Sequence, residues 1–206
     1  MAGIAEKILI YAAGLPEGEV LSAKALLHLG SRAAVDQALS RLHRNGQLLR
    51  VGRGLYVRPV ESRFGTRAPQ PEKVIAGVAA ITGETVAPSG AAAANALGLS
   101  TQVPIRRVYL TSGRTRRFRL GGQVVELKHA PNWQLRRTAT GEVVRALAWL
   151  GRQHADEVVN RLKARLGPQE RTELFRARRG LPSWLAEPVG RAFNEEAAHA
   201  QALTEP

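Results

Sequence analysis

Residues 31–59 read SRAAVDQALSRLHRNGQLLRVGRGLYVRP. This stretch holds the clearest structural pattern of the chain. Its first half predicts a helix over about Arg32–Arg44, with Ser31 as the N-cap residue. Asn45-Gly46 ends this helix, because both residues tolerate a left-handed backbone. Apolar side chains recur along the helix at a spacing that forms one stripe: Val35, Ala38, Leu39 and Leu42.

Two strand-like segments make up the second half of this stretch, Gln47–Val51 and Leu55–Arg58. The loop Gly52-Arg53-Gly54 joins them as a hairpin, and Pro59 ends the unit. A basic helix followed by an arginine-tipped hairpin is typical of a winged helix-turn-helix, whose second helix enters the major groove of DNA. We therefore expect double-stranded DNA as the first partner.

The side chains that point away from the apolar stripe suit this role. An arginine can donate two hydrogen bonds to guanine, a glutamine can pair in the same way with adenine, and an alanine can contact a thymine methyl group. Basic residues on the hairpin would meet phosphate or enter the minor groove. The predicted DNA-binding residues are Ser31, Arg32, Ala33, Gln37, Ser40, Arg41, Arg44, Arg50, Arg53 and Arg58.

Composition supports a nucleic-acid partner. The 206 residues have a formal net charge of +13, and the positive excess is spread along the chain. Such an excess is the usual footprint of a nucleic-acid-binding protein. A GC-rich coding sequence would explain why Arg outnumbers Lys 25 to 5, but it does not explain the sign of the imbalance.

Several classes of protein are disfavoured. The absence of cysteine excludes disulfides, thiolate metal sites and cysteine nucleophiles. The N-terminal segment has an acidic residue, Glu6, and no basic region before its apolar part, so it is a poor signal peptide. The apolar runs are too short to span a membrane. We expect a cytoplasmic protein with no membrane partner.

The remaining patterns extend the fold to both sides. Upstream, helices are expected over Gly3–Ala13 and, with Ser22 as its cap, Ala23–Leu29. Residues 60–71 are polar and contain glycine and proline, so they are read as a linker. Helices are predicted next over Glu72–Thr82 and Gly90–Leu97.

Three strands and a helical end complete the chain. The strands are predicted over Arg106–Thr111, Arg116–Leu120 and Gln123–His129, with Gly121-Gly122 as a hairpin turn. Further helices are predicted over Gly141–Arg152, Ala155–Leu166 and Pro168–Arg178, with Pro182 and Pro188 as breakers. The fold class is α+β, a winged helix followed by a mixed α/β domain with a small sheet and a helical end. The expected domains are residues 1–59, a linker at 60–71, a second domain at 72–194 and a tail at 195–206.

A second group of basic residues lies on the first two of these strands and their connecting loop: Arg106, Arg107, Arg114, Arg116, Arg117 and Arg119. Because strand side chains alternate, Arg117 and Arg119 share one face while Phe118 and Leu120 occupy the other. Six like charges repel one another, which favours a surface for an acidic partner, RNA or flanking DNA. The alternative is an ordinary solvated sheet face.

Three segments resemble the AbiEi-type antitoxin and transcriptional regulator family: RVGRGLYVRP, PSGAAAANALGLSTQVP and VYLTSGRTRRFRLGGQVVELKHAP. The resemblance covers about residues 5–135. It implies an antitoxin of a type IV toxin–antitoxin (abortive infection) system that represses its own operon by binding promoter repeats through the winged helix. It also implies a nucleotidyltransferase-like toxin opposed without a stable complex, a monomer or weak dimer that cooperates on DNA, and an antitoxin role for the Arg106–Arg119 cluster.

Two other classes of function stay open. One is a protein-interaction module that uses the same fold. The other is a metal-dependent nuclease, because Glu126 and Lys128 form an E-x-K triplet that would need Glu72 or Glu84 as a second acid. The five histidines are scattered without ligand spacing, and no nucleotide-binding loop is present. We expect no enzyme, no catalytic residues, no cofactor and no metal, and we expect the three tryptophans to pack internally.

Overall fold

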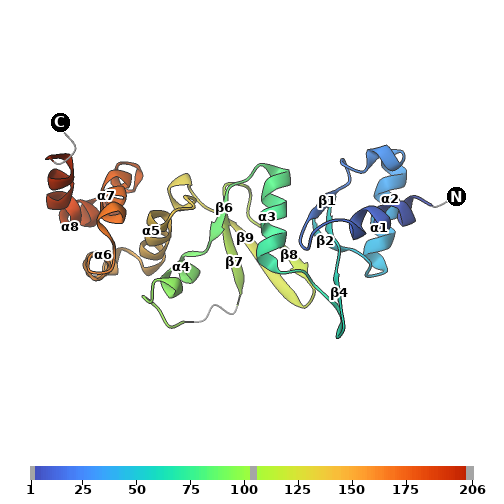
Figure 1. The fold of residues 1–206 in the computed structure, drawn as a ribbon, viewed down its shortest axis with the longest axis horizontal. Helices are drawn as coiled ribbons and strands as arrows, with labels where there is room; N and C mark the ends of the chain where they lie inside the picture. The colour runs from blue at the N-terminus through green and yellow to red at the C-terminus, as the bar shows by residue number, and fades with distance from the viewer. Residues whose placement is uncertain (1–2, 103–105, 203–206) are drawn as a thin grey trace. The chain divides into compact units, whose positions relative to one another are not determined.

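The structure is a computed structural model that describes residues 3–102 and 106–202, with side chains as far as Asn194. It is a mixed α+β chain with small sheets, and it divides into two compact units (Figure 1). The first unit contains Met1–Val86 and Arg106–His129, and the second contains Ala87–Ile105 and Ala130–Pro206. The chain therefore crosses between the units three times, and this division differs from the expected domains.

The first part of the first unit contains the helix and hairpin that the sequence predicts. Its elements are α1 (Ile4–Ala13), β1 (Val20–Ser22), the 3₁₀ helix η1 (Leu27–Leu29), α2 (Arg32–Arg44), β2 (Leu49–Gly52) and β3 (Leu55–Val57). The three strands form an antiparallel sheet in the order β1-β3-β2. The bounds of α2 and its Ser31 cap are as predicted, while the assignment of this arrangement as a winged helix stays a prediction.

The small sheet is covered on both faces because its residues alternate. Leu21 and Tyr56 pack with Ile8, Leu39 and the other buried side chains of α1 and α2. Their neighbours face the opposite way and join a second core with α3 (Pro71–Thr82) and two strands of a larger sheet. The buried residues of this second core are Val20, Val51, Val57, Val74, Ile75, Val78, Phe118, Leu120, Val125 and Leu127.

The larger sheet has the strand order β6-β7-β9-β8. Its strands are β6 (Val86–Pro88), β7 (Arg107–Thr111), β8 (Arg116–Leu120) and β9 (Gln123–His129). The β7–β9 pair is parallel, and the β8–β9 hairpin is antiparallel around the predicted Gly121-Gly122 turn. The predicted alternation on β8 is confirmed, since Phe118 and Leu120 are buried while Arg117 and Arg119 are exposed.

The second unit is helical. Its elements are α4 (Gly90–Ala96), the 3₁₀ helix η2 (Asn132–Gln134), α5 (Ala139–Leu150), η3 (Arg152–His154), α6 (Ala155–Lys163), α7 (Pro168–Ala177), η4 (Arg178–Gly180) and α8 (Ser183–Ala202). The core includes Leu147, Leu162, Leu185 and Phe193, and Trp133 and Trp184 pack against it as expected. Trp149 differs from the expectation, since it is 41% exposed.

Three predictions about local structure are wrong. Residues 23–26 form turns before η1 instead of an α-helix, because the Ala23 N–H donates to the Gly54 carbonyl and ties the segment to the hairpin. The segment read as a linker contains a β-hairpin, β4 (Val60–Ser62) and β5 (Gly65–Arg67). Pro188 lies inside α8, which continues as helix through much of the expected tail.

Candidate nucleic-acid interface

Helix α2 presents one buried face and one solvent face. The Ala34 N–H donates to the Ser31 hydroxyl at 3.3 Å, which caps the first turn. The predicted apolar stripe is buried throughout, from Val35 to Leu42. All the predicted DNA-binding residues on the helix and its cap are exposed: Ser31, Arg32, Ala33, Gln37, Ser40, Arg41 and Arg44.

The arginines on this exposed face differ in whether they already have an acidic partner. Arg32 donates through Nε to Asp36 at 2.8 Å, which also neutralises the acidic residue of the helix. Arg41 has no ion-pair partner among the described residues, and Arg44 reaches only the Ser40 carbonyl, at 3.5 Å. An exposed pair of this kind is worth about 0.3–0.5 kcal/mol, so a phosphate group could displace Asp36 from Arg32.

The β2–β3 hairpin holds the other predicted residues. Gly54 has a φ of +69°, which allows the tight turn that exposes Arg53. The Arg50 guanidinium Nε donates to the Gly52 carbonyl at 3.2 Å, and Arg50 stays exposed beside the tip. Arg58 is half-buried, so it is less accessible than the sequence indicates.

Contacts at the end of α2 fix the hairpin relative to the helix. His43 Nδ1 lies 3.1 Å from the Leu48 carbonyl oxygen, within hydrogen-bond distance. The His43 ring also meets the Tyr56 ring edge-to-face, with 6.3 Å between centroids. These contacts connect the last turn of α2 to the residue that precedes β2 and to β3. The hairpin that carries Arg53 is therefore packed against the end of α2.

The second basic group differs from its prediction, because three of its six arginines have carboxylate partners. Arg117 pairs with Glu126 at 3.1 Å, and Arg107 pairs with Glu72 at 3.4 Å. The other members are exposed and have no ion-pair partner among the described residues: Arg106, Arg114 and Arg119. The electrostatic repulsion within the cluster is therefore weaker than that among six unpaired arginines.

The third pair lies closer to the interior. Arg116 Nη2 donates to Glu84 at 2.9 Å, and the buried Thr111 hydroxyl donates to the same carboxylate at 2.6 Å. Burial raises the pKa of Glu84, but the hydrogen bonds from Arg116 and Thr111 outweigh it and leave the pKa below its ordinary value. This contact joins the end of α3 to the β7–β8 loop.

The carboxylates considered for a nuclease site, Glu126 of the E-x-K triplet and Glu72, have partners within the protein instead. Glu126 pairs with Arg117, and Glu72 accepts a hydrogen bond from the Tyr109 hydroxyl at 2.8 Å. Burial and this acceptor raise the pKa of Tyr109. Within residues 3–102 and 106–194, no three acidic or histidine side chains gather as a metal site would require. That the protein is no enzyme stays a prediction.

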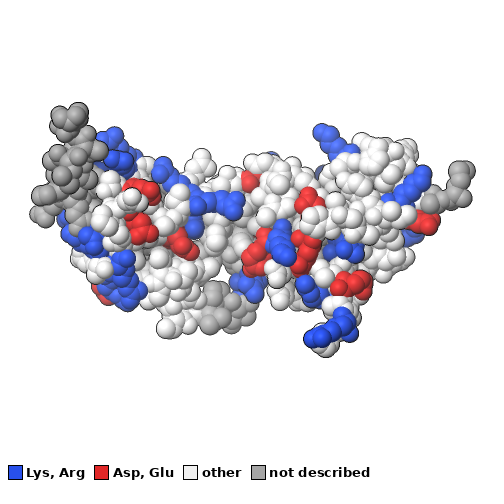
Figure 2. Space-filling model, viewed as in Figure 1, with Lys and Arg blue, Asp and Glu red and all other residues white. Residues whose placement is uncertain are grey.

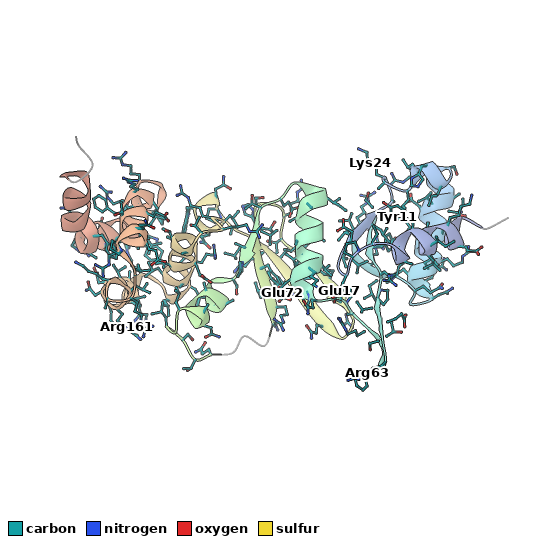
Figure 3. All side chains as sticks on the ribbon, viewed as in Figure 1. Tyr11, Glu17, Lys24, Arg63, Glu72 and Arg161 are labelled. Carbon is teal, nitrogen blue, oxygen red and sulfur yellow. The ribbon has the colours of Figure 1, made fainter. Side chains whose placement is uncertain are left out.

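One constellation was missed by sequence reasoning. Glu17 accepts hydrogen bonds from Lys73 at 2.7 Å, from Arg67 at 2.9 Å and from the Gln70 N–H at 3.1 Å (Figure 3). These partners lower its pKa to about 2. They lie more than forty positions along the chain, so no local pattern indicates them. Glu17 fixes the base of the β4–β5 hairpin to the start of α3.

The profile of a family of unknown function, DUF6088, matches residues 5–174. The chain belongs to this DUF6088 family. No curated protein matches it. Among solved structures, this DUF6088 member is similar to the RV2827C protein from Mycobacterium tuberculosis, with 18% identity and a TM-score of 0.49 over 97% of this chain and 80% of the other.

No described helix of this DUF6088 member combines the length and the apolar character that crossing a bilayer requires.

Proposed function

We propose that this protein is a DNA-binding transcriptional regulator, with α2 as the helix that reads the major groove and Arg53 as the tip of a wing. One observation supports this most directly. Along α2, Gln37 and Arg41 are exposed on the face opposite the buried stripe, and neither is engaged by an acidic residue among those described. Both side chains can form the paired hydrogen bonds that distinguish bases in the major groove.

The roles of the other basic residues follow from their positions. Arg44 lies at the end of α2, and Arg50 and Arg53 lie on the hairpin that His43 and Tyr56 connect to it. Contacts to phosphate from these positions would set the orientation of the helix but would carry no sequence information. The net charge of +13 would add a salt-dependent attraction to any duplex.

Binding to the duplex upstream of the protein's own gene, compared with a scrambled duplex, tests this proposal. We expect Arg41→Ala to weaken binding to the upstream duplex by about 5- to 150-fold, the cost of losing one bidentate base contact, and to affect the scrambled duplex less. Arg53→Ala should weaken binding to both. Arg161→Ala removes one exposed arginine from the second unit and is the charge-matched control.

Two results would contradict the proposal. If the wild-type protein shifts neither duplex at moderate salt, a protein-interaction module becomes the better assignment. If Arg41→Ala weakens binding to both duplexes equally, α2 does not read bases through this residue.

We also propose, from the resemblance to AbiEi-type antitoxins, that the regulator counteracts a nucleotidyltransferase-like toxin. The best candidates for this role are the cluster's exposed arginines without carboxylate partners among the described residues, namely Arg106, Arg114 and Arg119. Co-expression with a toxin-like protein encoded beside the gene tests it by growth. Arg114→Ala with Arg119→Ala should reduce rescue, whereas the DNA-reading variant Arg41→Ala should not. Equal rescue by all variants would remove Arg114 and Arg119 from this role, and no rescue by the wild type would remove the antitoxin role itself.

A further inference from the structure

The β4–β5 hairpin has no role in the proposed major-groove contact. Its two strands pair only with each other, Val60 opposite Arg67 and Ser62 opposite Gly65. Figure 1 shows the hairpin extending away from α1 and α2 within the first unit, and Figure 3 places Arg63 at its far end. This segment is therefore a projection of the first unit.

The tip of this hairpin holds an exposed aromatic ring beside a cation. Phe64 is 87% exposed, more than any other large apolar side chain in the described part of the chain. The Arg63 guanidinium lies over its ring, with 4.7 Å between Cζ and the ring centroid. Such a cation–π contact favours keeping the guanidinium and the ring next to each other. Neither side chain packs against a core cluster of the fold.

The turn is held in shape by polar contacts. The Ser62 hydroxyl donates to the Gly65 carbonyl at 2.7 Å and accepts from the Phe64 N–H at 3.3 Å. Gly65 has a φ of +100°, which other residues rarely adopt. At the next pair of opposed residues, the Thr66 hydroxyl donates to Glu61 at 3.1 Å. A preorganised tip loses little conformational entropy when it binds.

The base of the hairpin is anchored as well. Arg67 pairs with Glu17, which also binds Lys73 and the Gln70 N–H at the start of α3. The anchor sets the direction in which the tip projects. It also uses the charge of Arg67, so the free positive charge of the hairpin is at its tip, where Arg63 has no ion-pair partner among the described residues.

These features indicate what kind of partner the tip of the hairpin would bind. A free guanidinium is attracted to the negative potential of a narrow minor groove, and an adjacent apolar ring is the kind of side chain that inserts between base steps and bends the duplex. A hydrophobic protein pocket would accept Phe64 but would leave the Arg63 charge without a counterion. In Figure 2 the far end of this projection is blue, and the red surface nearest to it lies on the side toward the body of the first unit.

We propose that the β4–β5 hairpin is a second DNA contact, in which Phe64 wedges between base pairs from the minor groove while Arg63 pairs with the flanking backbone. The inference rests on the proposed function, because it places the hairpin on the duplex that α2 reads. It adds a property that the helix alone does not predict, namely that the protein bends its operator.

The test measures affinity and bending separately on the full-length protein. The probe is the duplex upstream of its own gene, circularly permuted for gel mobility and end-labelled for energy transfer. We expect the wild type to bend it and Phe64→Ala to lose the bend, with affinity lower by about 5- to 150-fold, the range for removing one aromatic stacking contact. Phe64→Leu keeps an apolar wedge and should retain the bend.

The remaining variants separate charge from insertion. Arg63→Ala should keep the bend and lower the slope of log affinity against log salt by about one. Ile10→Ala removes another side chain that is 66% exposed and serves as the matched control. Phe64→Ala with an unchanged bend and affinity overturns the wedge and leaves the proposed function intact. A wild type that binds no duplex overturns both.

Discussion

Substitution of Gly90 tests the close packing of α4 against α5 in the second unit. A Cβ atom at this position would lie 2.5 Å from the Arg145 carbonyl oxygen and 2.5 Å from Trp149 Cβ. The first of these atoms is backbone, so no rotamer change can relieve the overlap. Gly90→Ala therefore requires the two helices to move apart.

Two effects of opposite sign determine how much Gly90→Ala changes the free energy of unfolding. Replacing glycine by alanine in a helix stabilises it by at most about 1 kcal/mol, and by less at Gly90 because it is the first residue of α4. Overpacking a close contact costs about 1–3 kcal/mol. The steric term is larger, so we expect the free energy of unfolding of the second unit to fall by about 1–2 kcal/mol.

Tryptophan fluorescence in urea measures this change selectively, because Trp133, Trp149 and Trp184 all lie in the second unit. With a slope of about 2 kcal/mol per molar urea, the transition midpoint should fall by about 0.5–1 M. Gly180→Ala is the control, since a Cβ there meets nothing within 4 Å. A Gly90→Ala midpoint equal to or above that of the wild type would refute the packing argument.

Three further predictions concern other parts of the fold. Glu17 has its pKa lowered to about 2, so its contribution to stability is complete above its unfolded pKa of 4.5 and is lost as the pH falls toward 2. Glu17→Gln should therefore show faster hydrogen exchange in the β4–β5 hairpin at neutral pH, and the difference should vanish near pH 2. Ser31→Ala should lower the opening free energy of α2 amides by about 1 kcal/mol in hydrogen exchange, and an unchanged value would exclude the cap. Pro188→Ala should raise the urea midpoint detected by tryptophan fluorescence. Alanine is about 3 kcal/mol more favourable than proline inside a helix, and this gain exceeds the packing energy lost with the buried ring. A lower midpoint would contradict this prediction.

Local periodicity made much of the fold predictable. The bounds of α2 are as expected because an apolar stripe, an N-cap and a glycine stop all agree. The β8–β9 hairpin is as expected because the side-chain alternation of its first strand and the Gly121-Gly122 turn agree. Its turn also contained information that was not used, because a hairpin centred on Gly121-Gly122 places Arg117 opposite Glu126. The pairing of that arginine could have been predicted from the sequence.

The errors have physical causes that a local pattern does not contain. Residues 60–67 have the composition of a linker, and their strands face solvent on both sides, so no apolar alternation reveals them. Pro188 usually breaks a helix, but α8 buries Leu185, Val189 and Phe193, and this burial offsets the lost hydrogen bond. The partners of Arg107 and Arg116 come from α3 and the turn after it, which only the tertiary fold brings near.

The three crossings between the units have a consequence for synthesis of the chain. Strand β9 lies between β7 and β8, so the larger sheet cannot form until residue 129 has left the ribosome. Until then, Val20, Val51 and Val57 lack the part of their cover that β8 and β9 supply in the finished protein. A nascent or truncated chain that ends near residue 59 would expose this apolar surface to aggregation or chaperones. Helix α2 and the small sheet that it packs on are therefore encoded early, but the larger sheet that covers the opposite face of the small sheet is completed only when more than half of the protein has been translated.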